Sequence, residues 1–264
     1  MEAVVLFKGA GEMASGAARR LHLAGFRVVM TELAQPLCVR RTVSFAECVY
    51  NGRTTVEDVQ ASSAKTLEEI ETVWERGEIA VSVDPECKLL HELRPSIVID
   101  ARLAKRNLGT KISDAELVIG LGPGFAAGQD VHAVVETNRG HNLGRVFYTG
   151  SAEINTAEPA PVCGITYQRV LRPTVSGKWT SSKSIGDSVR VGDIIGEVSE
   201  ISVTAEISGV LRGVAHSGLF VEAGCKVGDI DPRNDSKCCF TISDKANAIA
   251  GGVMEAVFYF KRQS

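Results

Sequence analysis

The sequence has no surplus of basic residues, because 29 Lys and Arg residues stand against 32 Asp and Glu residues. The net charge of −3 argues against a general nucleic-acid-binding protein, which usually carries an excess of positive charge. No apolar run approaches the roughly 18 residues that a membrane-spanning helix requires. Residues 1–7 contain no basic leader and are typical of a first strand rather than a signal peptide. We therefore expect a cytoplasmic protein that binds neither nucleic acid nor membranes.

The sequence also lacks paired cysteines, since its seven cysteines form no C-x-x-C motif and their number is odd. This pattern favours free thiols in a reducing compartment over a disulfide framework. No set of Cys and His residues has the spacing of a zinc site, so we expect no bound metal. The sequence leaves open whether Cys238 and Cys239 form a redox pair or lie on opposite faces of a strand. It also leaves open whether Cys163 is a thiol ligand or a linker residue, and which oligomeric state the chain adopts.

Residues 1–155 alternate between strand-like and helix-like segments, which predicts a Rossmann-like α/β domain with a mostly parallel sheet. Short apolar runs with β-branched residues predict the strands. Helical spacing of apolar residues, ending at a glycine, predicts the helices. The expected strands are Ala3–Phe7, Arg27–Thr31, Ile79–Val83, Ile97–Ile99 and Leu117–Leu121, and the expected helices are Glu12–Ala24 and Lys65–Arg76.

A second domain is expected over residues 160–240, where short β-branched runs alternate with Gly-Asp and Ser-Gly turns. The pattern G-x-x-V-x-x-G-x-x-x-G begins at Gly186 and repeats from Gly218, 32 residues later. Two such halves are typical of a small biotinyl/lipoyl-like β-sandwich. Carriers of this kind attach biotin or lipoate to a Lys at a hairpin tip, but the expected tip, Ser199–Val203, contains no Lys. We therefore expect neither group, and we expect a helix over 243–264 to follow the β domain.

A glycine-rich turn directly follows the first expected strand and opens the first expected helix. Gly9 would permit a tight turn, Gly11 would let a phosphate approach the backbone, and Ala14 would let the helix pack closely on the sheet. The N–H groups and partial positive charge at the helix N-terminus favour an anion. Glu32 ends the next strand, where a carboxylate would bind a ribose hydroxyl. The set predicts a site for NAD(P) or another adenine nucleotide, and the alternative is a turn that has lost its ligand.

Two further loops follow expected strands and should reach the same carboxyl edge of the sheet. One is basic, and its side chains could hold a phosphate or a carboxylate. The other is rich in glycine, so a ligand could approach its backbone closely. We expect the two loops to form one anion site for a small phosphorylated ligand. The residues expected to contribute are Arg102, Lys105, Arg106, Gly120, Gly122 and Gly124.

The densest polar group of the chain follows over residues 130–145. Asp130, His132 and Arg139 are further candidates for binding an anion or substrate. His132 or His141 could act as a general acid or base near neutral pH, and Lys105 could donate a proton. The catalytic residues stay open at this stage, because a single His is usually structural and the sequence has no G-x-S-x-G motif.

Three long stretches resemble the YqeB family of selenium-dependent molybdenum hydroxylase accessory proteins. They are Lys8–Gly16 with Glu32, Pro36 and Arg40–Arg41 behind it, then Asp100–Thr110, and then Gly120–His141. The resemblance runs along nearly the whole chain, including Gly228–Arg233 and Ser243–Ala246. The family is distantly similar to the xanthine dehydrogenase maturation factor XdhC, which also has a Rossmann domain and handles molybdenum cofactor.

The resemblance implies a helper in the maturation of a molybdenum hydroxylase, with that enzyme as partner and the molybdenum-pterin cofactor as a possible ligand. It establishes no reaction, so it stays open whether the chain is an enzyme. One alternative is an NAD(P)-dependent oxidoreductase with His132 or Lys105 as proton donor. Another is a non-catalytic module whose β domain docks the client enzyme.

Overall fold

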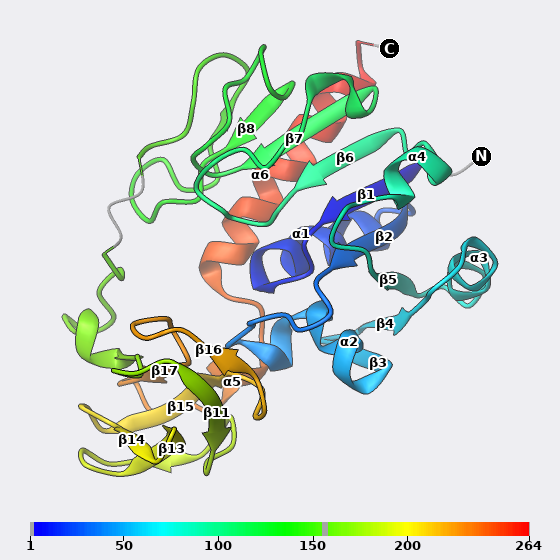
Figure 1. Cartoon of the computed structure of the whole chain (residues 1–264). Coiled ribbons are helices and arrows are strands. Elements are labelled where there is room, and N and C mark those ends of the chain that lie inside the picture. Colours follow the sequence, from blue (N-terminus) through cyan, green and yellow to red (C-terminus); the bar gives the residue numbers. More distant parts are fainter. Residues whose placement is uncertain (1–2, 155–157, 264) are drawn as a thin grey trace. The chain divides into compact units, whose positions relative to one another are not determined.

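The computed structural model describes residues 3–154 and 158–263 (Figure 1). The chain divides into two compact units, and each unit combines separate stretches of sequence. Unit 1 comprises Met1–Pro36, Ser44–Thr156 and Ile242–Ser264, and unit 2 comprises Leu37–Val43 and Ala157–Thr241. The segment that follows Pro36 therefore belongs to the same unit as the β-rich second half of the sequence.

Unit 1 is built on one nine-stranded sheet in the order β3-β4-β5-β2-β1-β6-β7-β8-β9. From β4 to β8 in this order, each strand pairs with its neighbours in parallel. At the two edges, β3 pairs with β4 and β9 pairs with β8 antiparallel. The strands are β1 (Val4–Lys8), β2 (Arg27–Glu32), β3 (Arg53–Val56), β4 (Val59–Ser63), β5 (Ile79–Val83), β6 (Ile97–Asp100), β7 (Leu117–Leu121), β8 (Ala133–Val135) and β9 (Val146–Phe147).

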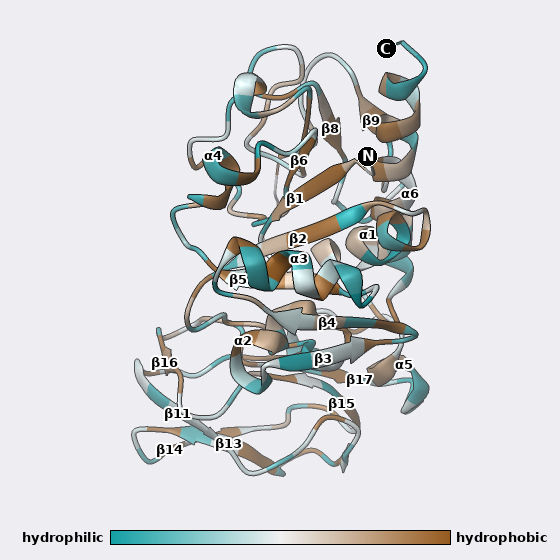
Figure 2. Ribbon diagram, turned by 90° about the vertical axis from the view of Figure 1, so that its right-hand side faces the viewer, coloured by the Kyte–Doolittle hydropathy of each residue, from teal (hydrophilic) through white to brown (hydrophobic). Residues whose placement is uncertain are grey.

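Helices cover both faces of this sheet, with α1 and α6 on one side and α3 and α4 on the other (Figure 2). Figure 2 also shows β1 and most of β2 as hydrophobic, which is expected of strands buried on both faces. Alternate strand residues, such as Leu6 and Val29, pack with Ile70 and Trp74 of α3 in one hydrophobic core. The helices are α1 (Glu12–Leu23), α2 (Cys48–Asn51), α3 (Leu67–Glu75), α4 (Leu89–Leu93) and α6 (Asp244–Lys261), with short 3-10 helices at Phe45–Glu47 and Ile112–Asp114.

Small residues let α1 and α6 lie against each other. A Cβ placed on Gly16 would lie 3.1 Å from the Cβ of Ala246, so a larger residue at this position of α1 would push against α6. Ala14, Ala17 and Ala18 of α1 are also fully buried. The C-terminal helix thereby becomes part of unit 1, and it holds the helix that begins at the glycine-rich turn.

Unit 2 contains two four-stranded antiparallel sheets, in the orders β10-β17-β15-β12 and β14-β13-β11-β16. Trp179 of β11 is fully buried and donates its indole N–H to the Ala215 carbonyl. The strands are β10 (Val170–Leu171), β11 (Gly177–Ser181), β12 (Ser188–Val189), β13 (Ile194–Val198), β14 (Ile201–Thr204), β15 (Gly209–Val214), β16 (Phe220–Val221) and β17 (Gly228–Asp231), with α5 (Lys237–Phe240) and 3-10 helices at Arg41–Val43 and Tyr167–Arg169.

The predicted fold class, a Rossmann-like parallel sheet followed by a biotinyl/lipoyl-like β-sandwich, is wrong. The large sheet is mixed, because an antiparallel strand closes each of its edges, and unit 2 forms two separate antiparallel sheets. The edge strands escaped prediction for a physical reason. β3 is polar and mostly exposed, and β9 has only two residues, so neither has the apolar run that marks a buried strand.

The repeated glycines of unit 2 occupy tight turns. Gly186 and Gly218, the first glycines of the two repeats, have φ values of 100° and 97°. The next glycines, Gly192 and Gly224, have φ values of 88° and 76°, which other residues rarely adopt. The turn between β13 and β14 is made by Ser199 and Glu200, both with positive φ, and no Lys lies in it.

Within the described residues, no helix is long and apolar enough to cross a membrane.

Candidate anion-binding site

The glycine-rich turn after β1 is fixed by hydrogen bonds to its backbone. Gly9 has a φ of 99°, and the Ala10 N–H donates to Oε2 of Glu32 over 2.9 Å. The Ala10 carbonyl accepts from the hydroxyls of Ser15 and Ser44, at 3.1 and 2.9 Å. Glu32 ends β2 as predicted, but its carboxylate is engaged by this turn and by the Leu33 N–H at 2.8 Å. The turn is therefore held in shape before any ligand arrives.

Gly11 caps the N-terminus of α1 and faces open space. Its backbone is extended, with φ −68° and ψ −179°, and a Cβ placed on it would meet nothing within 4 Å. The N–H groups of the first turn of a helix have no partner within the helix and carry a partial positive charge. The position thus combines anion-favouring donors with room for a ligand.

A buried polar cluster lies beside this turn, at the ends of β1 and β6. Arg102 forms two hydrogen bonds to the Asp100 carboxylate, with Nε to Oδ1 at 3.0 Å and Nη2 to Oδ2 at 2.5 Å. Lys8 Nζ donates to Thr110 Oγ1 and to Asp114 Oδ2, both at 2.8 Å. Arg102, which was predicted to contact an anion directly, is thus largely engaged by Asp100. Its half-buried guanidinium still adds positive charge next to the glycine-rich turn.

The loops after β1, β6 and β7 touch one another through their glycines. A Cβ placed on Gly9 would lie 3.3 Å from the Cα of Arg102, and one on Gly124 would lie 2.6 Å from the Cα of Arg106. Gly124 has a φ of 107°, so both its conformation and its close approach require glycine. Gly122, with a φ of 78°, packs in the same way against the Thr137 side chain, and Gly120 against the Phe125 ring. The basic loop and the glycine-rich loop therefore lie side by side, as predicted from the sequence.

Two cations of the basic loop are available to a ligand. Lys105 and Arg106 are exposed, and neither side chain makes a hydrogen bond or ion pair with any described residue. Lys105 has a φ of 63° and Leu103 a φ of 54°, so both residues of this loop adopt the left-handed region. The positive charge at this edge of the sheet thus comes from the helix terminus, from Lys8 and Arg102, which are paired with carboxylates, and from these two exposed side chains.

The polar residues predicted over 130–145 do not join this group. His132 precedes β8, at the amino end of the strand, where its Nδ1 accepts the Val118 N–H at 3.0 Å and its ring packs edge-on against Phe260. Asp130 accepts the Ala126 N–H at 2.9 Å and closes a turn. Arg139 binds both carboxylate oxygens of Asp244 at 2.7 Å, and His141 is exposed. The structure gives each of the first three a structural contact.

Sequence reasoning missed three side chains at the carboxyl edge. Lys8 and Thr110 were noticed only within longer motifs, although a Lys that directly precedes the first glycine of such a turn is a signal for a charge at the strand end. Cys87 follows β5, with its Sγ 3.9 Å from Thr31 Oγ1. Burial raises the pKa of the Cys87 thiol above its usual value, against the opposing effect of Lys8 and Arg102, so this thiol stays protonated at neutral pH.

Within residues 3–154 and 158–263, no group of three or more His, Cys, Asp or Glu side chains is placed to hold a metal ion.

No protein-family model matches the chain. A curated relative, the uncharacterized protein YqeB of Escherichia coli K12, is 48% identical over 260 residues, which cover 98% of this chain and 48% of the relative. The chain thus spans about half the length of the curated relative that it matches. The activity, substrates and partners of the whole protein are therefore matters for proposal.

Solved structures similar to this chain include an aspartoacylase family protein and an ectoine utilization protein. An aspartoacylase family protein from Mesorhizobium loti is 14% identical, with 87% of this chain and 84% of that chain covered and a TM-score of 0.27. The ectoine utilization protein EutE from Ruegeria pomeroyi, in its product-bound form, is 12% identical, with 87% and 85% covered and a TM-score of 0.26. With TM-scores this low, these similarities carry no argument about activity.

The expectation of a selenium-dependent molybdenum hydroxylase accessory protein is wrong by these comparisons. The YqeB relative is uncharacterized, the structural neighbours named are aspartoacylase, desuccinylase and ectoine utilization proteins, and none of these names refers to molybdenum, selenium or XdhC. The expected functions in cofactor maturation, NAD(P)-dependent oxidation and client docking are wrong with it, whereas the expected nucleotide or molybdenum-pterin ligand and the hydroxylase partner are not tested and stay predictions. What remains for a functional argument is the site itself.

Proposed function

We propose that unit 1 binds a small phosphorylated ligand of the adenine nucleotide class at the carboxyl edge of its nine-stranded sheet. The observation that carries this proposal is the meeting of three loops. Gly9 packs on Arg102, and Gly124 packs on Arg106, so the N-terminus of α1 and the basic loop face the same edge. Ligands of open parallel sheets bind in this position, outside the carboxyl ends of the strands.

Each part of the site contributes a different interaction with a bound phosphate. The first turn of α1 offers N–H groups and a partial charge of about +0.5. The open space over Gly11 lets a phosphate reach those groups, whereas any side chain there would fill it. Lys105 and Arg106 are exposed, and a guanidinium such as that of Arg106 can donate to two phosphate oxygens at once. Glu32 keeps the turn in shape through the Ala10 N–H.

The substitution Gly11→Asp tests the proposal, because it should move stability and binding in opposite directions. Asp is a favoured N-cap residue and its charge suits a helix N-terminus, so the variant should be as stable as the wild type or more stable by about 0.3–1 kcal/mol. The same carboxylate occupies the phosphate position and repels an anion. We expect calorimetry to show ADP binding to the wild type and none to Gly11→Asp.

Gly251→Asp is the matched control, since it adds the same charge to unit 1 at a different place. Gly251 lies on α6, where the atom nearest to an added Cβ is Arg20 Nη1 at 3.8 Å. This variant should bind ADP as the wild type does. Equal affinity in Gly11→Asp and Gly251→Asp, or no binding of ADP to the wild type, would contradict the proposal.

Arg106→Ala gives the expected size of one cationic contact. A charge-assisted hydrogen bond contributes about 1.5–3 kcal/mol, which is a factor of roughly 10–150 in affinity. The variant should lose affinity for ADP by such a factor and keep its stability, because the exposed side chain makes no hydrogen bond or ion pair with the described residues. Unchanged affinity would remove Arg106 from the site.

We also propose that the protein works in the cytoplasm. All seven cysteines are free thiols, and five of them, Cys38, Cys87, Cys163, Cys225 and Cys238, are at least partly exposed. Exposed thiols persist in a reducing compartment and oxidise outside it. Cell fractionation should recover the protein with the cytoplasmic markers, and recovery in an oxidising compartment would contradict this.

A further inference from the structure

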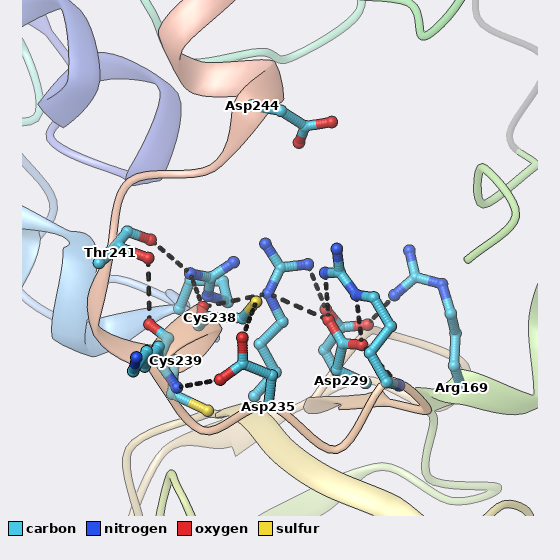
Figure 3. Close-up of polar contacts among 12 residues, drawn as sticks. Arg169, Asp229, Asp235, Cys238, Cys239, Thr241 and Asp244 are labelled. Carbon is cyan, nitrogen blue, oxygen red and sulfur yellow. Dashed lines mark hydrogen bonds and ion pairs between the residues drawn. The ribbon is translucent and has the colours of Figure 1, made fainter. Parts of the chain in front are cut away.

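One face of the β10-β17-β15-β12 sheet of unit 2 carries a cluster of charged side chains. Asp229 and Asp231 lie two residues apart on β17 and therefore point to the same face, while Ile230 between them points into the core. Arg212 lies on β15, the neighbouring strand, and Arg169 directly precedes β10 on the other side. Figure 3 shows the row that results, with Arg169 and Asp229 at one end and Cys238 and Thr241 at the other.

The cluster holds more positive than negative charge. Asp229 faces Arg169, Arg212 at 3.9 Å and Lys226 at 3.5 Å. Asp231 accepts two hydrogen bonds from the Arg233 guanidinium, at 2.9 and 2.6 Å, and one from the Arg233 backbone N–H at 3.0 Å, and it lies 3.8 Å from Arg212. Four cations thus surround two carboxylates. Burial disfavours the ionised Asp231, but the hydrogen bonds from Arg233 outweigh it and hold the pKa of Asp231 below its usual value, so both signs of charge are present.

Arg212 has N–H donors that make no hydrogen bond to the described residues. Its side chain is 10% exposed, and its distances to the two carboxylates, 3.9 and 3.8 Å, are too long for hydrogen bonds. A guanidinium has five N–H donors. Over the described part of the chain, Arg212 uses one of them, from Nε to the Cys238 carbonyl at 3.4 Å. Among the described residues, no Arg212 nitrogen is a fully buried atom without a hydrogen-bond partner, so its remaining N–H donors reach the surface and can meet a further acceptor beside the two carboxylates.

The backbone of β15 is also irregular at Arg212. The pairing of β15 with β17 runs from Leu211 opposite Ile230 to Gly213 opposite Asp229, so Arg212 is the extra residue of a β-bulge. Bulges bend a strand and redirect a side chain, and they are frequent next to functional sites. Arg40 donates to the same Cys238 carbonyl at 3.0 Å, which adds a further buried guanidinium beside Arg212.

We propose that this face of unit 2 is a second anion site, which binds a phosphate dianion through Arg212 with Arg169, Arg233 and Lys226 around it. The planar forks of several Arg side chains match the oxygens of a phosphate, which accepts paired hydrogen bonds. With Arg40 and Asp235 included, five cations face three carboxylates, and the two charges of a phosphate dianion balance the difference. The dianion is inorganic phosphate or the phosphate group of a small organic monoester, and this site is independent of the one proposed for unit 1.

The test uses the full-length chain with Gly11→Asp, so that binding in unit 1 does not contribute. Inorganic phosphate and glycerol 3-phosphate are titrated separately and followed by 31P NMR at constant ionic strength. Saturable binding of either supports the site, and the tighter of the two identifies the source of the phosphate. Binding of neither, or equal binding of succinate as a dicarboxylate, would overturn the proposal.

Two variants in the same background assign the binding to the cluster. Arg212→Gln should weaken phosphate binding by about 10-fold to 150-fold, the range of one or more charge-assisted contacts. If Arg212→Gln does not fold, Lys226→Gln, which changes a more exposed side chain, tests the assignment of phosphate binding to the cluster. This variant should weaken phosphate binding by about 10-fold. Lys178→Gln, which removes the same charge from β11 of the other sheet, should bind as the parent does. Equal affinity of the parent with both Arg212→Gln and Lys226→Gln would refute the assignment.

Discussion

At the scale of single residues, the sequence predicted which positions lie at the carboxyl edge better than what their side chains do there. Glu32 and Arg102 occupy their expected places, but Glu32 binds the Ala10 N–H and Arg102 binds Asp100. A sequence shows the type of a charged residue and its neighbours along the chain. It does not show which donor satisfies the charge, because partners such as Ala10 and Glu32 lie 22 residues apart.

His132 gives a prediction about pH. Burial lowers the pKa of His132, so the folded chain favours the neutral imidazole, whose Nδ1 accepts the Val118 N–H. The unfolded chain titrates near the ordinary value of about 6.5. As the pH falls through that value, the unfolded state binds a proton that the folded state resists, so the free energy of unfolding decreases. The contribution of His132 is complete above that pH and is lost below it.

The substitution His132→Asn should remove this part of the pH dependence, because the Asn carbonyl can replace Nδ1 as acceptor but does not titrate. Urea denaturation between pH 7.5 and 5, in steps, measures the free energy of unfolding of both chains. We expect a shallower loss of stability towards low pH in His132→Asn than in the wild type. The exposed His141→Asn serves as control, and identical profiles for wild type and His132→Asn would show that His132 contributes nothing.

At the scale of elements, the apolar pattern predicted the central strands and two helices of unit 1 well. The helix expected over Lys65–Arg76 is α3, Leu67–Glu75, which begins at Thr66 because the Thr66 hydroxyl accepts the Glu69 N–H at 3.2 Å. It ends before Gly77, whose φ is 70°. The pattern failed at the edges of the sheet. There β3 is mostly exposed and β9 has only two residues, so neither sequence contains the apolar run of a buried strand.

Contact between the two loops of the proposed site can be tested by a pair of glycine substitutions. Gly124 and Gly128 both have positive φ, so an Ala at either position costs about 1–2 kcal/mol for the backbone alone. An added Cβ on Gly128 meets nothing within 4 Å, whereas one on Gly124 collides with the backbone of Arg106. Urea denaturation should therefore show Gly124→Ala to be less stable than Gly128→Ala, by about 1–3 kcal/mol for the forced displacement of the loop. Equal losses would mean that the loops do not touch.

At the scale of the whole molecule, the composition of the chain could not reveal how its segments are distributed. The sequence suggested a simple division into residues 1–155 and 160–240, whereas Leu37–Val43 belongs to unit 2 and Ile242–Ser264 to unit 1. Both assignments depend on contacts between residues far apart in sequence, such as Gly16 with Ala246. Such contacts leave no local pattern of hydrophobicity or turn residues from which to infer them.

Removal of α6 should therefore damage unit 1, although α6 is the last element of the chain. A chain that ends at Thr241 would expose the small apolar residues of α1 that α6 covers. We expect this chain to bind a hydrophobic dye and to lose the cooperative urea transition of unit 1. A chain that ends at Lys261 keeps all of α6 and should behave as the wild type. An unchanged transition after removal of α6 would contradict its place in unit 1.

The central claim, that three loops of unit 1 form one phosphate site, is tested most directly by backbone amide NMR during a titration with ADP. The account predicts saturable shifts concentrated in three stretches of sequence, Gly9–Ala14, Arg102–Arg106 and Gly122–Gly124, with one common affinity. The amides around His132, at the opposite end of β8, should stay unchanged. Shifts that avoid these three stretches, or an absence of shifts at saturating ADP, would contradict the account.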